Sequence, residues 1–363
     1  AGAVANSVYG ATDEAYIADI YYAASAQIVA KAAAVLGLEE TRQNYQAIAD
    51  RQWQVVKEEY FTATGRCAVK TQTGLVLALK YHLSDNERLT EQMLRKLLRD
   101  NKNKLNTGFV GTPLLCNVLT EHGMTDLAYR LLLNEEDPGW LHEVKLGATT
   151  VWERWNSLDE NGRISSTGMN SLNHYSYGAV LEWIFRHVAG IDVTEQGPGG
   201  KMMRISPKVN HKLGSASAVY DSASGCYRCG WQIENGDQIT VTITVPFGAK
   251  AQVILPYAPD SVYHDTDNPL FETVENGICC VKAGQYTVTY KAASPLKKSY
   301  SVDSTLEDLL AEPAIRAFLS NMMEVDMIPD LAYGLTLRQA AEAFAGGVSA
   351  EQAQRLNVLL EEF

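Results

Sequence analysis

The sequence lacks any hydrophobic run long enough to cross a membrane. A membrane-spanning helix needs about 18 consecutive apolar residues, and the longest candidate, near residues 15–36, is interrupted by Asp19 and Lys31. The chain also lacks an initiator methionine and a charged leader with a cleavage site, so no signal peptide is expected. Because it starts with AGAVANSVYG, we interpret it as a piece of a longer protein. Since no apolar run is long enough, we expect no membrane partner.

Positive charge is scarce in this chain. Its 31 Lys and Arg residues stand against 43 Asp and Glu residues, which gives a net charge of −12 at pH 7. Contacts to phosphate groups need clustered cations, so this balance excludes nucleic acids and anionic lipid surfaces as partners. A neutral or cationic small substrate is easier to accommodate.

The six cysteines do not follow the spacing of a disulfide framework, and 363 residues bury a large core without one. Cys226 and Cys229 form a CxxC motif, but no second pair follows at zinc-site spacing. The adjacent Cys279 and Cys280 are expected to point to opposite faces of a strand. The sequence therefore predicts reduced, metal-free cysteines and a reducing, cytoplasmic location.

The length predicts more than one domain, and residues 13–190 have the apolar spacing of helices. Thr12 is expected to cap the first helix and Gly37 to end it. A long irregular stretch at 143–171 interrupts the pattern, and such loops often carry function. The expected helices cover about 13–36, 40–60, 70–83, 87–102, 112–121, 124–134 and 172–189.

From about residue 197 the pattern alternates between apolar and polar residues, which is typical of antiparallel strands. Asn-Gly pairs at 235–236 and 276–277 predict tight turns between strands. The chain becomes helical again after Pro295. We expect strands at 238–248, 251–256 and 285–290, and capping boxes at Ser304/Glu307, Thr336/Gln339 and Ser349/Gln352. The predicted domains are a helical domain at 1–195, a β-sandwich at 196–297 and a helical appendage at 298–363.

Candidate functional residues concentrate in the irregular stretch. Glu153 lies between Trp152 and Trp155, and His174 follows in an Asn-His-Tyr sequence at the start of an apolar helix. Tryptophan faces stack against sugar rings, and a carboxylate held beside them can act as a general base on water. The pattern therefore indicates a carbohydrate site.

A purely structural interpretation is slightly favoured by the residue types alone. Glu153 could pair with Arg154 while the tryptophans pack in the core, and His174 could cap its helix or bond a backbone carbonyl. Other catalytic motifs are missing. His142-Glu143 begins an HExxH zinc motif, but Leu146 replaces the second histidine, and no GxSxG or P-loop sequence occurs.

The exact sequences of two segments indicate a protein family more specifically than the residue types do. LNTGFVGTPLLCNVLTEHGMTDLAYRLLLNEEDPGWLHEVKLGATTVWERWNS and MNSLNHYSYGAVLEWIFRHVAGI resemble the α-L-rhamnosidases of glycoside hydrolase family 78, with a match through residues 10–256. The resemblance implies an (α/α)6 barrel followed by an antiparallel β-sandwich, and cofactor-free hydrolysis of terminal α-L-rhamnose with inversion. It implies that Glu153 is the general base and that His174 binds substrate. Trp140, Trp152 and Trp155 are the expected sugar-binding aromatic residues.

The resemblance also implies a missing part. The family's general acid lies in the first half of its barrel, and nothing in this sequence matches that acidic motif. The pattern predicts about seven helices, whereas a six-hairpin barrel needs about twelve. We therefore expect the second half of the barrel, the sandwich and a helical tail. Its expected partners are a rhamnose-containing glycoside and the N-terminal half of the same protein.

Two other functions remain open at this point. A non-catalytic carbohydrate-binding protein could keep the fold and use the tryptophans and His174 for binding only. A polysaccharide lyase would need a Tyr or His that abstracts a proton beside a uronate, and cations for the uronate carboxylate. The acidic balance and the resemblance of the WERW segment disfavour the lyase.

Overall fold

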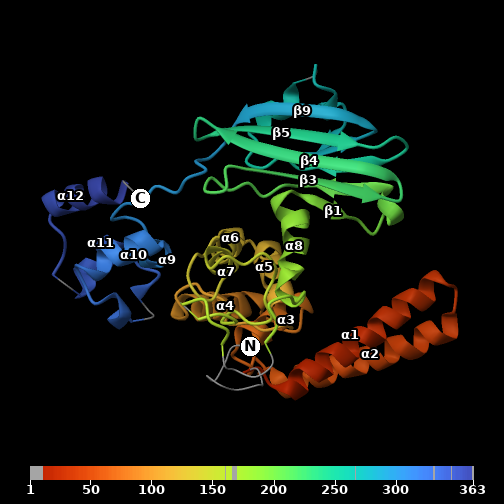
Figure 1. Ribbon diagram of the computed structural model, residues 1–363, viewed down its shortest axis with the longest axis horizontal. Helices are drawn as coiled ribbons and strands as arrows, with labels where there is room; N and C mark the ends of the chain where they lie inside the picture. Colours follow the sequence, from red (N-terminus) through yellow and green to blue (C-terminus); the bar gives the residue numbers. More distant parts are fainter. Residues whose placement is uncertain are drawn as a thin grey trace. The chain divides into compact units, whose positions relative to one another are not determined.

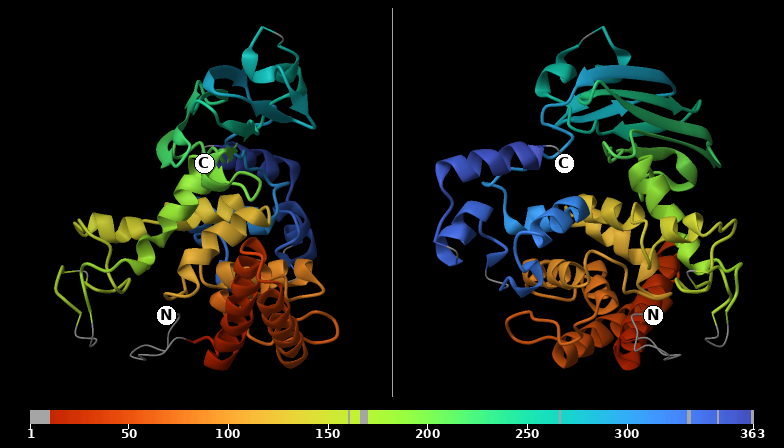
Figure 2. Two further views of the ribbon diagram at one scale, coloured as in Figure 1. Left: turned by 90° about the vertical axis from the view of Figure 1, so that its right-hand side faces the viewer. Right: turned by 60° about the vertical axis from the view of Figure 1, so that its left-hand side comes forward.

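The computed structural model describes residues 11–159, 161–165, 170–265, 267–329, 332–344 and 346–361 (Figures 1 and 2). The chain divides into two compact units. The first contains Ala1–Ile233 with Ile239–Tyr290, and the second contains Glu234–Gln238 with Lys291–Phe363. The domain limits expected from the sequence stay a prediction. No helix of the described residues is both long enough and apolar enough to span a bilayer.

The first unit opens with helices that pair as hairpins, α1 with α2, α3 with α4 and α5 with α6. Figure 1 shows the α1–α2 hairpin as two long helices side by side. The helices are α1 (Glu14–Val35), α2 (Glu39–Tyr60), α3 (Gln72–Lys80), α4 (Glu87–Asp100), α5 (Thr112–Glu121), α6 (Thr125–Leu132), α7 (Trp140–Lys145) and α8 (Val180–Trp183).

The two ends of α1 test the expected caps. Asp13 is the N-cap and its carboxylate accepts the Tyr16 N–H over 2.9 Å, so the prediction of Thr12 as the cap was wrong. The Thr12 hydroxyl is bonded instead to the Thr71 hydroxyl at 2.7 Å. The prediction for Gly37 is confirmed, because it has φ 71° directly after the helix, a conformation that glycine adopts without strain.

The last expected helix of the barrel region begins later than predicted. A 3-10 helix at Ser176–Ala179 leads into α8, and a π-helical turn at Ile184–Val188 follows. The irregular stretch is correspondingly longer at this end, although α7 occupies its start. The residues between α7 and the 3-10 helix therefore carry the candidate site on a loop.

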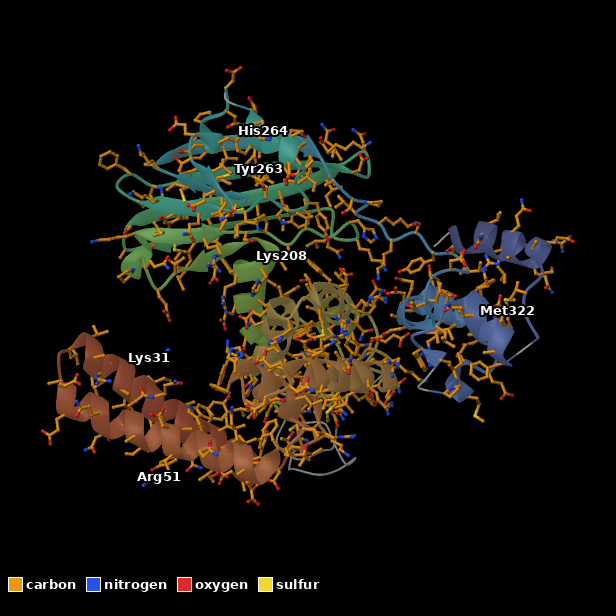
Figure 3. All side chains as sticks on the ribbon, turned by 180° about the vertical axis from the view of Figure 1, so that it is seen from behind. Lys31, Arg51, Lys208, Tyr263, His264 and Met322 are labelled. Atoms are coloured by element: carbon orange, nitrogen blue, oxygen red, sulfur yellow. The ribbon has the colours of Figure 1, made fainter. Side chains whose placement is uncertain are left out.

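The chain continues from α8 into a β-sandwich of two sheets. The Trp231 indole donates to the Val188 carbonyl over 2.7 Å, and the Tyr129 hydroxyl donates to the carbonyl of Lys208, which Figure 3 labels near α8. One sheet has the order β1 (Ile191–Val193), β2 (Met202–Ile205), β6 (Lys250–Val253), β8 (Ile278–Val281) and β7 (Val274–Glu275). The other has the order β3 (Ser215–Ser222), β4 (Gly225–Glu234), β5 (Gln238–Val245) and β9 (Gly284–Lys291).

The sheet features expected from the sequence are confirmed. Both Asn-Gly pairs lie between adjacent strands and have positive φ, at 52° and 82° for Asn235 and Gly236. Cys279 is buried and Cys280 is exposed, as alternation along a strand requires. One pairing differs from the antiparallel pattern, because β2 and β6 run parallel.

The second unit is helical and has a core of its own. It contains α9 (Leu306–Ala311), α10 (Pro313–Ser320), α11 (Leu337–Phe344) and α12 (Ala350–Glu361). Two expected capping boxes are confirmed by reciprocal hydrogen bonds, Thr336 with Gln339 and Ser349 with Gln352. The third was wrong, since Thr305 rather than Ser304 caps α9 by accepting the Asp308 N–H over 3.2 Å.

Candidate active site

Main-chain hydrogen bonds bring the Glu153 and His174 segments together. The Glu153 N–H donates to the Ser171 carbonyl over 2.9 Å, and the His174 N–H donates to the Val151 carbonyl over 2.8 Å. The Ser171 N–H in turn donates to Oε2 of the Glu153 carboxylate over 2.8 Å. Glu153 is half-buried. The two predicted site residues therefore lie on adjacent stretches of one loop, with the carboxylate held by the main chain.

Two of the predicted aromatic residues, Trp140 and Trp155, pack together with Tyr177. The Trp155 ring stacks on Tyr177 with centroids 4.0 Å apart, and Trp140 meets Trp155 edge-on at 5.3 Å. The Trp140 indole also donates to the Tyr177 carbonyl over 2.9 Å. All three tryptophans, including Trp152, are buried. This burial favours the interpretation in which they pack and stiffen the loop, and their contact with sugar stays a prediction.

The ion pair that the structural interpretation placed between Glu153 and Arg154 does not occur among the described residues. The main-chain N–H of Arg154 donates to the Ser157 hydroxyl over 3.1 Å, a bond that does not involve the guanidinium. The Glu153 carboxylate therefore has a main-chain partner, and among the described residues no cationic side chain forms an ion pair with it. A carboxylate placed in this way can accept a proton from water.

The His174 ring is oriented by three contacts. Its Nδ1 accepts the Ser176 N–H over 3.3 Å, at the first residue of the 3-10 helix, which is the cap-like contact of the structural interpretation. The ring stacks with Phe109 at 4.9 Å and with Tyr175 at 5.2 Å. Because Nδ1 is an acceptor, the neutral ring carries its proton on Nε2, which is then available as a donor.

Phe109 and Tyr175 were missed as candidate residues. Phe109 lies on the loop between α4 and α5, and its ring also meets Tyr177 at 5.6 Å. Phe109 is 47% exposed and Tyr175 is 85% exposed. No local pattern in the sequence singles them out, because Phe109 reaches His174 only where two loops distant in sequence meet.

Glu143 on α7 is the second carboxyl group near this loop. Its side chain is only 3% exposed, the Trp152 N–H donates to it, and its Oε1 has no hydrogen-bond partner among the described residues. Burial raises its pKa to about 8, against the lowering effect of the Trp152 N–H, and the charge of Asp137 raises it further. The raised pKa favours the protonated form of Glu143 at neutral pH, and its hydrogen-bond partner Trp152 is the residue that precedes Glu153.

Helical hairpins that lead into a β-sandwich define the class of the chain, a six-hairpin glycosidase domain with a C-terminal sheet domain. Residues 3–188 match the family described as the bacterial alpha-L-rhamnosidase 6 hairpin glycosidase domain, and residues 190–268 match the bacterial alpha-L-rhamnosidase C-terminal domain. The chain belongs to the bacterial α-L-rhamnosidase family, as the WERW and NHY segments indicated.

Individual relatives agree with this assignment. An alpha-L-rhamnosidase of Formosa agariphila is 35% identical over 270 residues, 74% of this chain and 29% of that protein. One from Alteromonas sp. is 35% identical over 283 residues, 76% of this chain and 30% of that protein. The chain thus spans less than a third of the length of these relatives.

Solved structures show the same fold. The Streptomyces avermitilis α-L-rhamnosidase in complex with L-rhamnose has a TM-score of 0.69 and 32% identity, over 76% of this chain and 27% of that one. The native Aspergillus terreus enzyme has a TM-score of 0.69 and 27% identity, over 79% of this chain and 31% of that one.

Proposed function

We propose that this chain is the base-bearing part of an inverting α-L-rhamnosidase that removes terminal α-L-rhamnose from glycosides. The observation that carries the proposal is the position of Glu153, a half-buried carboxylate whose Oε2 is held by the Ser171 N–H at 2.8 Å. Family membership supports it, and so do the names of the relatives.

In the proposed reaction, Glu153 removes a proton from water as the water oxygen attacks the anomeric carbon. The bond from that carbon to the leaving-group oxygen breaks, and a general acid donates a proton to that oxygen. Inverting hydrolysis uses two carboxyl groups about 6.5–9.5 Å apart, because the water lies between the base and the sugar. Buried Glu143 does not supply the acid, since its carboxyl is enclosed by the protein.

His174 is proposed to bind the sugar rather than transfer protons. Its Nδ1 is bonded to the Ser176 N–H, so Nε2–H is the remaining polar edge. That edge can donate to a rhamnose hydroxyl. The three predicted tryptophans are proposed to support the loop: Trp140, Trp152 and Trp155. Direct contact of these residues with the sugar is a further prediction.

The general acid is proposed to come from the N-terminal half of the barrel. The short span of this chain relative to its relatives supports this. Exposed apolar residues on the α1–α2 hairpin also support it, including Val35 at 88% exposed, Leu36 and Ile28. A contiguous exposed apolar surface is a common place of contact with another protein segment. Figure 3 labels Lys31 and Arg51 on the same hairpin.

The test is the variant Glu153→Gln in a form of the protein that hydrolyses an aryl α-L-rhamnoside. Loss of the base should lower kcat by about 10²–10⁴. Glu182→Gln, on the exposed side of α8, is the matched control and should retain the wild-type rate. Proton NMR of the first product should show the β anomer of L-rhamnose. Unchanged turnover by a folded Glu153→Gln protein contradicts the assignment of the base.

A non-catalytic carbohydrate-binding protein is the second candidate. The observation that favours it is that the loop supplies one half-buried carboxylate, that of Glu153, and the polar Nε2 edge of His174. These two groups suffice for binding. It predicts that L-rhamnose binds while aryl rhamnosides are not hydrolysed, even after the N-terminal half is added. Turnover that depends on Glu153 excludes it.

A further inference from the structure

We propose that Asn170 is a positioning residue that holds the loop of the base Glu153 in its reactive geometry. The inference rests on the proposed function and deepens it, because Glu153 needs a fixed position only if it acts on water. Asn170 directly precedes Ser171, whose N–H donates to the Glu153 carboxylate over 2.8 Å. The Asn170 side chain makes a second contact across the same loop, since its Nδ2 donates to the Ser157 carbonyl over 3.0 Å.

Ser157 closes the turn that follows the base, and it is fully buried. Its hydroxyl accepts the main-chain N–H of Arg154 over 3.1 Å, and its own N–H donates to the Arg154 carbonyl over 3.1 Å. The Ser157 carbonyl also accepts the Ser165 N–H over 2.9 Å, and its two lone pairs allow it to accept from Asn170 as well. The residue after the base is therefore tied to the turn to which Asn170 is bonded.

The Asn170 contact is a second point of attachment between the two segments of this loop. Glu153 and Ser171 exchange hydrogen bonds at the first point, about which the segments can pivot. The bond from Asn170 to Ser157 lies on adjacent residues and removes this freedom. A displacement of about 1 Å at a reacting group can lower a rate by about 100-fold, so the second attachment bears on catalysis.

The amide oxygen of Asn170 indicates that stability alone does not account for this residue. Its Oδ1 is buried and has no hydrogen-bond partner within the described ranges of the chain. A buried acceptor without a partner costs about as much free energy as one hydrogen bond supplies, so the side chain adds little to stability. Turning the amide over would place Oδ1 against the Ser157 carbonyl, acceptor against acceptor, so the bonding pattern assigns Nδ2 as the donor.

Asn170 should affect the rate of the reaction rather than the binding of the sugar. His174 is held by other contacts, because its N–H donates to the Val151 carbonyl over 2.8 Å and its ring stacks with Phe109 at 4.9 Å. Loss of the Asn170 amide leaves these contacts in place and loosens the loop of the base. The expected signature is therefore a lower kcat with an unchanged Ki for L-rhamnose.

The test uses an aryl α-L-rhamnoside and the hydrolysing form of the protein, the chain itself or the chain with its N-terminal half. Asn170→Ala should lower kcat about 10-fold and leave the midpoint of thermal unfolding within about 3 °C of wild type. Asn170→Asp keeps the size of the side chain but replaces the donor by an acceptor, so it should lower kcat at least as much without opening a cavity. Asn161→Ala removes an exposed asparagine of the same loop and should keep the wild-type rate.

A double-mutant cycle separates a positioning role from a structural one. Asn170 acts through the base, so Asn170→Ala should lower kcat no further once Glu153→Gln has removed that base. A substitution that merely loosens the protein would lower the rate by the same factor in both backgrounds. That result would overturn the inference, as would an unchanged kcat in Asn170→Ala or a raised Ki for L-rhamnose.

The Glu153→Gln background also distinguishes failure of this inference from failure of the proposed function. If Glu153→Gln loses activity and Asn170→Ala does not, the assignment of the base stands and only the role of Asn170 is wrong. If Glu153→Gln keeps the wild-type rate, the proposed function is contradicted and the positioning role falls with it. A wild-type protein that hydrolyses no aryl rhamnoside has the same consequence.

Discussion

Ser171 and Glu153 exchange two hydrogen bonds. The Glu153 N–H donates to the Ser171 carbonyl over 2.9 Å, and the Ser171 N–H donates to Oε2 of the Glu153 carboxylate over 2.8 Å. A bond from a main-chain N–H to a charged carboxylate is stronger than a neutral one. One oxygen of the proposed base is therefore fixed by the backbone, which leaves the other to orient water.

Removing this N–H should impair the reaction without removing the carboxylate. Ser171→Pro has no N–H, and we expect kcat to fall by about 10- to 100-fold, which corresponds to a charge-assisted hydrogen bond of about 1.5–3 kcal/mol. Ser171→Ala keeps the N–H and loses only the hydroxyl that contacts Asn173, so it should stay within about twofold of wild type. Steady-state kinetics and thermal unfolding check both. Equal rates for the two folded variants would show that the contact does not position the base.

Glu143 should make stability depend on pH. Burial raises its pKa to about 8 from 4.5, so the folded protein keeps a proton that the unfolded chain releases. The free energy of unfolding therefore falls as pH rises from about 4.5 to about 8, by up to about 1.4 kcal/mol per pH unit from this group, and the effect levels off above pH 8.

The variant Glu143→Gln tests this dependence. A neutral amide removes the proton release, so the variant should gain stability relative to wild type across that pH range. Glu135→Gln, an exposed residue paired with Lys145, is the matched control and should follow the wild-type curve. Urea unfolding at pH 5, 7 and 9 measures the difference. Parallel curves for wild type and Glu143→Gln would mean that Glu143 is ionised in the folded protein.

Local features of the fold could be predicted where one residue decides the backbone. Gly37 ends α1 and the Asn-Gly pair at 235–236 turns the chain between β4 and β5, because positive φ is favourable for few residue types. The N-cap of α1 was harder to predict because two suitable residues are adjacent in the sequence. Thr12 and Asp13 can both cap a helix, and the contact of Thr12 with Thr71, distant in sequence, decides between them.

The composition of the candidate site was only partly predictable. Glu153 and His174 stood out through their sequence contexts, and the resemblance of the chain to its family gave them roles. Phe109 joins His174 only because two distant loops meet, and no local pattern reports such a contact. The burial of Glu143 was hidden for the same reason, since its charged type normally indicates an exposed helix position.

The corrected cap of α9 gives a stability prediction for the second unit. Thr305→Ala removes the oxygen that accepts the Asp308 N–H, so the free energy of unfolding of this unit should fall by about 1 kcal/mol. Thr305→Ser keeps the oxygen and should differ little from wild type. Chemical unfolding monitored by circular dichroism checks both. Equal stability of Thr305→Ala and wild type would show that the cap contributes nothing.

The CxxC cysteines should remain thiols. Cys226 and Cys229 are three residues apart on strand β4, which puts their Cα atoms about 10 Å apart at the usual rise of a strand. A disulfide needs Cα atoms within about 7 Å. Burial also raises the pKa of Cys229 to about 12, so it should react with a thiol reagent only after unfolding, whereas exposed Cys280 reacts first. Thiol titration and intact mass measure this, and a bridged mass or one bound zinc per chain would contradict it.

Because the proposed general acid lies in the N-terminal half of the barrel, residues 1–363 alone are expected to hydrolyse aryl rhamnosides poorly. Glu153 can activate water, but the carboxyl of Glu143 is enclosed by protein and cannot reach a departing oxygen. Loss of leaving-group protonation alone lowers the rate by about 10²–10⁴. Open sides of the site also admit water, which weakens its electrostatic interactions.

The measurement is an assay of the chain alone and then mixed with the separately expressed N-terminal half. We expect the mixture to regain activity, because the apolar residues of the α1–α2 hairpin, such as Val35 and Leu36, provide a surface for reassembly. Charged substitutions at both of these positions should then weaken the recovery without lowering the stability of the chain, since their side chains are already exposed. A chain that is fully active by itself would show instead that an acid lies within it. Asp159, exposed on the Glu153 loop, would be the first residue to replace, followed by Glu160, which lies outside the described residues.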